Sequence, residues 1–122
     1  MRLLFTGATG FIGRAAISYF QGKGYSITAW VRDVEKAKDL LGTGIHFLGP
    51  NSSDAALLEQ LKLADGVINL AGSPISGVRW TNKNKQGFFD SRVTLTHKLA
   101  DHINRCKTPP KVFISASAIG IY

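Results

Sequence analysis

The chain begins with a short apolar run, Arg2 to Phe5, that passes through a glycine-rich turn into a segment with apolar residues at helical spacing. The turn runs from Thr6 to Gly13, and the helical segment closes at Gly22 and Gly24. Glycine allows tight turns and close backbone approaches that other residues resist. A strand that turns so directly into a helix predicts the start of a β-α-β arrangement.

The alternation of strands and helices continues along the chain. Further strands are predicted over Tyr25 to Val31, Ile45 to Leu48, Gly66 to Leu70 and Lys111 to Ser115. Helices are predicted over Val34 to Leu41, capped by Asp33, and over Ala55 to Leu63, capped by Ser53 or Asp54. This order predicts an α/β fold with a doubly wound parallel sheet, five strands in the order 3-2-1-4-5 and helices on both faces.

One longer amphipathic segment is predicted as a single helix from about Asn82 to Arg105. Helical spacing places the following residues on its buried side: Phe89, Val93, Thr96, Ala100 and Ile103. Pro109 and Pro110 then enforce a break before the last strand.

Composition narrows the classes of protein. A chain of 122 residues with 44% hydrophobic content is one globular domain or part of one. With Cys106 alone and three histidines, it has no internal disulfide and no credible zinc cluster, so we expect no metal. There is no secretory leader pattern and no apolar run of about 18 residues, so we expect a cytoplasmic protein without a membrane partner.

Positive charge is concentrated in the second half of the chain. Residues 1–61 hold six bases and five acids, whereas residues 62–122 hold nine bases and three acids. Nucleic-acid binding is the alternative that this asymmetry raises, through Arg79, Lys83, Lys85 and Arg92, with Trp80 as a stacking residue. A phosphate-rich cofactor or substrate explains the charge better, and we expect no nucleic-acid partner.

The glycine turn has the context of a dinucleotide site. Gly7 permits the sharp exit from the strand, Gly10 lets backbone N–H groups approach a pyrophosphate, and Gly13 allows close packing of helix on sheet. The anion would rest on the helix N-terminus. The predicted cofactor-binding residues of the turn are Gly7, Thr9, Gly10, Phe11, Ile12 and Gly13.

The end of the second strand should carry the residue that selects the ribose. An acid there favours NAD, whereas a guanidinium pairs with the 2′-phosphate of NADP. Arg32 comes first after the apolar run, and Asp33 is better explained as an N-cap. We therefore expect NADP rather than NAD, with an exposed Arg32 of no function as the alternative.

Three motifs together resemble the extended and atypical short-chain dehydrogenase/reductases, which include the nucleoside-diphosphate-sugar epimerase-like proteins. They are Thr6-Gly7-Ala8-Thr9-Gly10-Phe11-Ile12-Gly13, Val67-Ile68-Asn69-Leu70-Ala71-Gly72 and Ile114-Ser115-Ala116-Ser117-Ala118-Ile119-Gly120-Ile121-Tyr122, with Arg79-Trp80-Thr81 and Asp90-Ser91-Arg92 between the last two. The resemblance covers the whole chain. It implies a Rossmann NAD(P)-binding domain over residues 1–122, as the N-terminal part of a longer chain.

The resemblance also implies roles for single residues. Leu70, Ala71 and Gly72 would contact the adenine-ribose side of the cofactor, and Ser117 would hydrogen-bond the reacting oxygen of a small substrate. Arg92 stands where extended members carry an asparagine near the nicotinamide, and it could address a phosphate or pair with Asp90.

The resemblance implies a catalytic Tyr-x-x-x-Lys pair well after Ser117, and we expect this pair to be missing from the chain. Tyr122 is not its tyrosine, because no lysine follows Tyr122 at that spacing. Two functions therefore stay open. One is hydride transfer at an oxygen-bearing carbon of a sugar-nucleotide-like or other small substrate. The other is a non-catalytic NADP sensor of the same fold. A homodimer is also left open.

Overall fold

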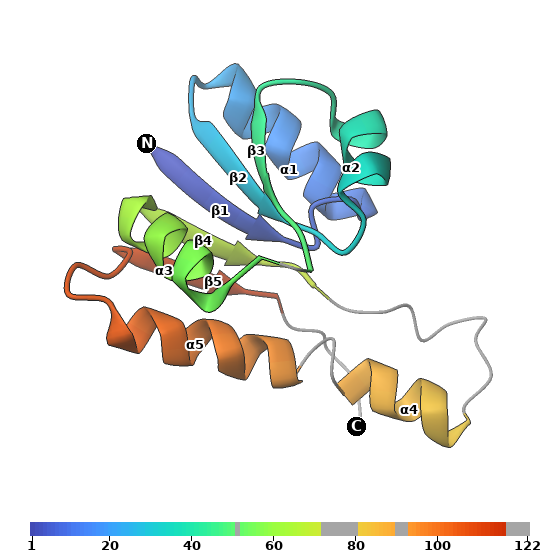
Figure 1. The fold of residues 1–122 in the computed structure, drawn as a ribbon. Helices are drawn as coiled ribbons and strands as arrows, with labels where there is room; N and C mark the ends of the chain where they lie inside the picture. Colours follow the sequence, from blue (N-terminus) through green and yellow to red (C-terminus); the bar gives the residue numbers. More distant parts are fainter. Residues whose placement is uncertain (51, 72–80, 90–92, 117–122) are drawn as a thin grey trace.

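The computed structural model describes residues 1–50, 52–71, 81–89 and 93–116 (Figure 1). In chain order its elements are β1 (Arg2–Thr6), α1 (Phe11–Gly22), β2 (Ser26–Trp30), α2 (Val34–Leu41), β3 (Ile45–Leu48), α3 (Asp54–Leu63), β4 (Gly66–Asn69), α4 (Asn82–Phe89), α5 (Leu95–Arg105) and β5 (Val112–Ser115). The strands form one sheet in the order β3-β2-β1-β4-β5, and every neighbouring pair is parallel. The predicted fold class and strand order are confirmed.

Two hydrophobic clusters lie on opposite faces of the sheet, because successive side chains of a strand point in opposite directions. Phe5 of β1 packs with Ile17 of α1 and Ala37 of α2 in the first cluster. Leu4, next to Phe5, packs with Leu57 and other residues of α3 in the second. Figure 1 shows α1 and α2 on one side of the sheet and α3 and α5 on the other, as doubly wound folds require.

Side-chain caps explain where two of the helices begin. The Asp33 side chain accepts a hydrogen bond from the backbone N–H of Lys36 at 3.1 Å, at the start of α2. The Ser53 hydroxyl accepts one from the backbone N–H of Ala56 at 3.1 Å, at the start of α3. Both caps satisfy N–H groups that have no partner within the helix. The predicted cap of α2 is confirmed, and Ser53 rather than Asp54 caps α3.

The single long helix predicted over 82–105 is wrong. The structure has two helices, α4 and α5, and a wider π-helical turn at Val93 and Thr94 precedes α5. Within α5 itself, the buried side is displaced from the predicted one. Leu99 and His102 are the buried residues of α5, whereas Val93 and Ala100 are exposed. Thr96 and Ile103 are half-buried, and the side chain of Phe89 lies outside the described residues.

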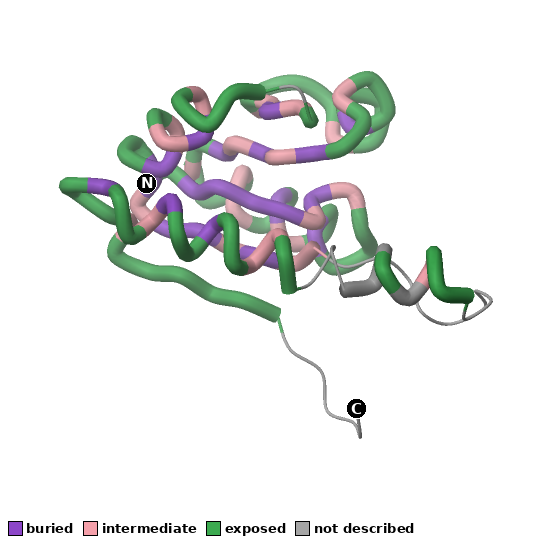
Figure 2. Tube along the Cα trace, turned by 60° about the horizontal axis from the view of Figure 1, so that its bottom comes forward, coloured by how far each residue is buried: buried purple, intermediate pink, exposed green. Residues whose placement is uncertain are grey.

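The central strands of the sheet are more deeply buried than the edge strand β5. Strands β1 and β4 run through the centre with mostly buried residues, whereas all four residues of β5 are exposed (Figure 2). Three of the four are the apolar residues Val112, Phe113 and Ile114. In the part of the chain that the structure describes, no helix is long and apolar enough to cross a membrane.

Candidate functional site

The glycine turn forms a tight connection between β1 and α1 at the carboxyl edge of the sheet. Gly7 follows the last residue of β1 with a φ of +66°, a left-handed conformation that favours glycine. The backbone N–H of Gly10 donates to the Gly7 carbonyl oxygen at 3.2 Å, and the N–H of Arg14 donates to the Gly10 carbonyl at 2.9 Å. The chain therefore leaves the strand and enters the helix within four residues.

Close backbone contacts within the protein require glycine at positions 7 and 13. A Cβ built on Gly7 would collide with the backbone of Leu70 and stand 2.7 Å from the Ala71 nitrogen. A Cβ on Gly13 would collide with the Gly7 carbonyl oxygen and stand 2.9 Å from the Cα of Ala8. These glycines allow the turn to pack directly against the end of β4 and the start of α1, as the sequence predicts.

Gly10 differs, because the protein leaves room beside it. Among the described residues, a Cβ there would meet only the Gly7 carbonyl oxygen, at 3.4 Å. No side chain caps the start of α1, and the next two residues, Phe11 and Ile12, are 85% and 67% exposed. The first N–H groups of a helix and its dipole attract an anion. The open side of the turn therefore has the chemistry of a phosphate cradle, with Thr9 half-buried beside it.

A buried polar cluster lies behind the turn, at the end of β4. The Thr6 hydroxyl donates to the Asn69 side-chain oxygen, and the backbone N–H of Ala71 donates to the Thr6 hydroxyl at 3.3 Å. The Asn69 amide nitrogen donates to the hydroxyls of Thr96, at 2.8 Å, and Ser115, at 3.2 Å. One amide thus links the ends of β1, β4 and β5 with α5.

Sequence reasoning missed this cluster, although one signal for it exists. Asn69 is a polar residue at the end of a strand that is otherwise apolar, and a buried amide needs hydrogen-bond partners. The cluster fixes the position of Leu70 and Ala71, both half-buried, beside Gly7. These two predicted cofactor residues therefore lie next to the glycine turn.

We expect Asn69→Ala to lower the free energy of unfolding by about 2–3 kcal/mol, because it leaves a buried Thr6 hydroxyl without its acceptor. Urea denaturation followed by circular dichroism measures the change. Asn104→Ala, on the exposed side of α5, is the matched control and should shift the value by less than about 0.5 kcal/mol. An equal effect of the two substitutions would contradict a structural role for the cluster.

Arg32 lies at the same edge of the sheet. The parallel register pairs Thr6 with Trp30, so Gly7 and Arg32 follow the ends of neighbouring strands. The Asp33 carboxylate is engaged as the cap of α2, whereas Arg32 is exposed and makes no ion pair with any described residue. The interpretation of Asp33 as an N-cap is confirmed, and the Arg32 guanidinium is left available at this edge.

Several predicted residues cannot be placed. Gly72, Arg92 and Ser117 lie outside the described residues, as do Arg79 and Trp80 of the nucleic-acid alternative. Of the remaining lysines in that alternative, Lys83 is an exposed residue of α4. Within the described ranges no group of three or more His, Cys, Asp or Glu side chains could hold a metal ion.

Contrary to the expectation, the chain does contain a Tyr-x-x-x-Lys spacing. The spacing occurs once, at Tyr19 and Lys23, where the Lys23 ammonium lies 5.6 Å from the centre of the Tyr19 ring. These residues are at the far end of α1, about 12 Å along the helix from its first residue. The pair therefore lies away from the glycine turn and is not the catalytic pair of the resembling family.

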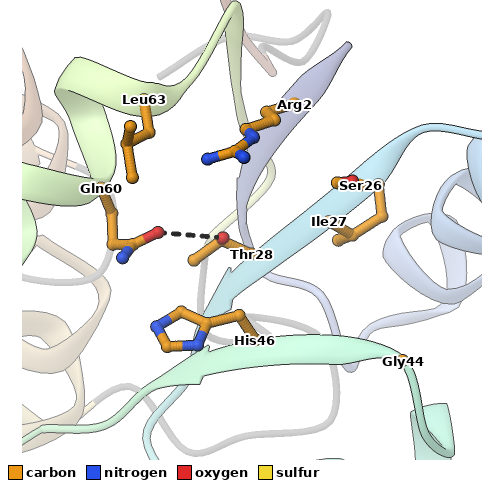
Figure 3. A pocket seen from close by; sticks show the side chains of 8 residues that line it. All are labelled: Arg2, Ser26, Ile27, Thr28, Gly44, His46, Gln60 and Leu63. Atoms are coloured by element: carbon orange, nitrogen blue, oxygen red, sulfur yellow. Dashed lines mark hydrogen bonds between the residues drawn. The ribbon is translucent and has the colours of Figure 1, made fainter.

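A groove lies at the amino edge of the sheet, opposite the edge that carries the glycine turn (Figure 3). This groove of about 350 Å³ is lined by Arg2, Ser26, Ile27, Thr28, Gly44, His46, Gln60 and Leu63. The Thr28 hydroxyl donates to the Gln60 side-chain oxygen across it, at 3.3 Å. The groove contains none of the predicted site residues, so it is separate from the glycine turn.

Known proteins resemble this chain over its whole length. The sequence profile of the NAD dependent epimerase/dehydratase family matches residues 3–122. The epimerase family protein YfhF of Bacillus subtilis is 35% identical over 122 residues, which cover 100% of this chain and 39% of that protein. The chloroplastic SDR39U1 homolog of Arabidopsis thaliana is 33% identical over 130 residues, covering 100% of this chain and 35% of that protein.

Solved structures agree with these sequence matches. The crystal structure of human epimerase family protein SDR39U1 with NADPH has a TM-score of 0.73 at 26% identity and covers 100% of this chain and 38% of that chain. A UDP-glucuronic acid 4-epimerase from Bacillus cereus, in complex with a UDP-sugar and NAD, has a TM-score of 0.71 at 22% identity, with 98% and 44% covered. The second likeness concerns the fold alone. The chain spans less than half the length of these relatives.

Proposed function

Because this chain belongs to the NAD dependent epimerase/dehydratase family, we propose that residues 1–122 form a nicotinamide dinucleotide-binding domain with the glycine turn beneath the pyrophosphate. The observation that carries the proposal is the uncapped start of α1 beside Gly10, where the described residues leave room for a ligand. Human SDR39U1, 26% identical, was crystallised with NADPH, which supports the same class of ligand here.

The proposed contacts follow from the edge of the sheet. Backbone N–H groups at Phe11, Ile12 and Gly13 would donate to the pyrophosphate oxygens, where the helix dipole favours negative charge. Leu70 and Ala71, fixed by the Asn69 cluster, would line the adenosine side together with Gly72. Thr9 would border the phosphates, and Arg92 is proposed as a further phosphate contact.

NADP is proposed over NAD because of the chemistry at the end of β2. Asp33 is the acid that could bind the ribose hydroxyls of NAD, but its carboxylate already caps α2. Arg32 offers a planar guanidinium with several N–H donors, which matches a phosphate group. The NADPH in the human SDR39U1 crystal structure supports the same preference.

We expect Arg32→Ala to weaken NADPH binding by about 10- to 30-fold and to leave NADH binding unchanged, because only NADPH carries the 2′-phosphate. Titration followed by cofactor fluorescence measures both dissociation constants. Arg2→Ala removes the same charge at the opposite edge of the sheet and serves as the control. If the wild type bound NADH as tightly as NADPH and Arg32→Ala changed neither, the assignment of Arg32 would be wrong.

For the whole protein we propose hydride transfer between the bound nicotinamide and an oxygen-bearing carbon of a sugar-nucleotide-like or other small substrate. The cofactor would supply the hydride chemistry, and Ser117 would hydrogen-bond the reacting oxygen and hold its developing charge. The second candidate is a non-catalytic NADP sensor. It needs only the cofactor contacts proposed at the glycine turn, where the start of α1 has no side-chain cap.

One experiment separates the two candidates. The intact protein, including whatever sequence follows residue 122, is mixed with UDP-sugars in the presence of NADP+, and with aldehydes and ketones in the presence of NADPH, while the NADPH absorbance is followed. Turnover that falls in Ser117→Ala, with NADPH affinity unchanged, supports the enzyme. Tight NADPH binding without turnover of any of these compounds supports the sensor.

A further inference from the structure

His102 is a buried histidine that the proposed cofactor site does not use. It lies on the side of α5 that faces α3, and only 4% of its surface is exposed. Figure 1 shows α3 and α5 side by side on one face of the sheet, and residues of the two helices are in contact. A buried imidazole must satisfy both ring nitrogens or lose hydrogen-bonding free energy.

The hydrogen bonds of the ring assign its tautomer. His102 Nδ1 lies 2.8 Å from the backbone carbonyl oxygen of Lys98, which can only accept a hydrogen bond. Nδ1 must therefore carry a hydrogen in every protonation state. In the neutral ring Nε2 is then an acceptor, and it has no hydrogen-bond partner among the described residues.

The group nearest to Nε2 is a carboxylate. Asp54 Oδ1, in the first turn of α3, lies 3.6 Å from Nε2, so in the neutral ring two acceptors face each other. The Lys98 ammonium lies 3.5 Å from the same Asp54 oxygen and competes for it. At the C-terminal end of α5, the Cys106 thiol donates to the His102 carbonyl oxygen at 3.4 Å. The nearby Asp101 and Arg105 pair with each other at 2.8 Å.

We propose that His102 is a pH-sensitive latch between α5 and the start of α3. Protonation adds a hydrogen at Nε2, which turns the contact with Asp54 from two opposed acceptors into a charge-assisted hydrogen bond. The latch is closed while Nε2 carries a hydrogen and open while it does not. Because Asp54 is 66% exposed, solvent screens the pair and the effect is modest.

The first test is the tautomer, measured by ¹⁵N NMR of the imidazole rings in the intact chain. At high pH His102 should show hydrogen on Nδ1, whereas the exposed His46 and His97 should show mainly the Nε2–H form of free histidine. These two residues are internal controls, and the measurement requires no substitution. An Nε2–H tautomer for His102 at high pH would overturn the proposal.

The second test is a double-mutant cycle with Asp54→Asn and His102→Leu, measured by urea denaturation at pH 5.5 and pH 8. The cycle removes the contributions of Lys98 and of the helix dipole, which act on Asp54 alone. At pH 5.5 the coupling should change the unfolding equilibrium constant by about two- to fivefold, and at pH 8 by a factor near one. A coupling that is equal at the two pH values, or larger at pH 8, would contradict the latch.

Discussion

Gly7→Ala should lower the free energy of unfolding by about 3–5 kcal/mol, enough to leave much of the chain unfolded. Two effects add. The substituted residue would be held at a φ of +66°, where an L side chain is strained, and its Cβ would collide with the backbone of Leu70. Backbone atoms cannot move aside as a flexible side chain can. Urea denaturation followed by circular dichroism gives the change directly.

Gly22→Ala is the matched control for this substitution. Gly22 ends α1, and a Cβ built on it meets no atom within 4 Å. Alanine favours helix over glycine, so we expect an unchanged or slightly more stable chain, by up to about 1 kcal/mol. If Gly7→Ala were as stable as Gly22→Ala, the protein would not adopt the tight turn at Gly7 between β1 and α1.

Gly10→Ala should impair binding rather than folding. We expect a folded protein that binds the dinucleotide at least about tenfold more weakly. Gly10 has an extended conformation with a φ of −73°, and its Cβ would meet only the Gly7 carbonyl oxygen at 3.4 Å. We therefore expect the free energy of unfolding to change by less than about 1 kcal/mol. The added methyl group would instead stand between the N–H groups of α1 and the phosphates. Cofactor fluorescence titration measures the loss of affinity.

The pair Gly7→Ala and Gly10→Ala separates folding from binding within one turn. A Gly10→Ala chain that kept the NADPH affinity of the wild type would show that the phosphates bind elsewhere. A Gly10→Ala chain that unfolded would show instead that Gly10, like Gly7, is needed by the protein itself.

Most of the fold could be predicted because each strand and helix carries its own local signal. The bounds of α2 and β3 match the prediction residue for residue, since Asp33 caps α2 and glycines follow α2 and β3. The parallel sheet and its order follow from the alternation of strands and helices, which allows few other connections. The central strands also have the apolar sequence that burial on both faces requires.

The region of α4 and α5 could not be predicted in the same way. A constant period of 3.6 residues from Asn82 to Arg105 predicts one helix, whereas a π-helical turn at Val93 and Thr94 precedes α5. His102 was also missed, because a histidine does not count as apolar although its neighbours bury it. The burial of His102 depends on packing against α3, whose residues are far away in the sequence.

The candidate site also has one part that local sequence predicts and another part that it does not. The strand, turn and helix around Gly7 and Gly13 are local and could be predicted, whereas the contacts that require these glycines, with Leu70 and with Ala8, are seen only in the structure. The Asn69 cluster joins residues 27 to 63 positions apart, so spacing along the chain does not indicate it. The roles of Ser117, Gly72 and Arg92 stay predictions, since these residues lie outside the described ranges.

Titration of the wild-type chain with NADPH, followed by cofactor fluorescence, tests the central proposal most directly. The proposal predicts saturable binding of one NADPH per chain, tighter than binding of NADH and weakened by Gly10→Ala. A folded chain, verified by circular dichroism, that bound neither NADPH nor NADH would contradict the assignment of the glycine turn as a dinucleotide site.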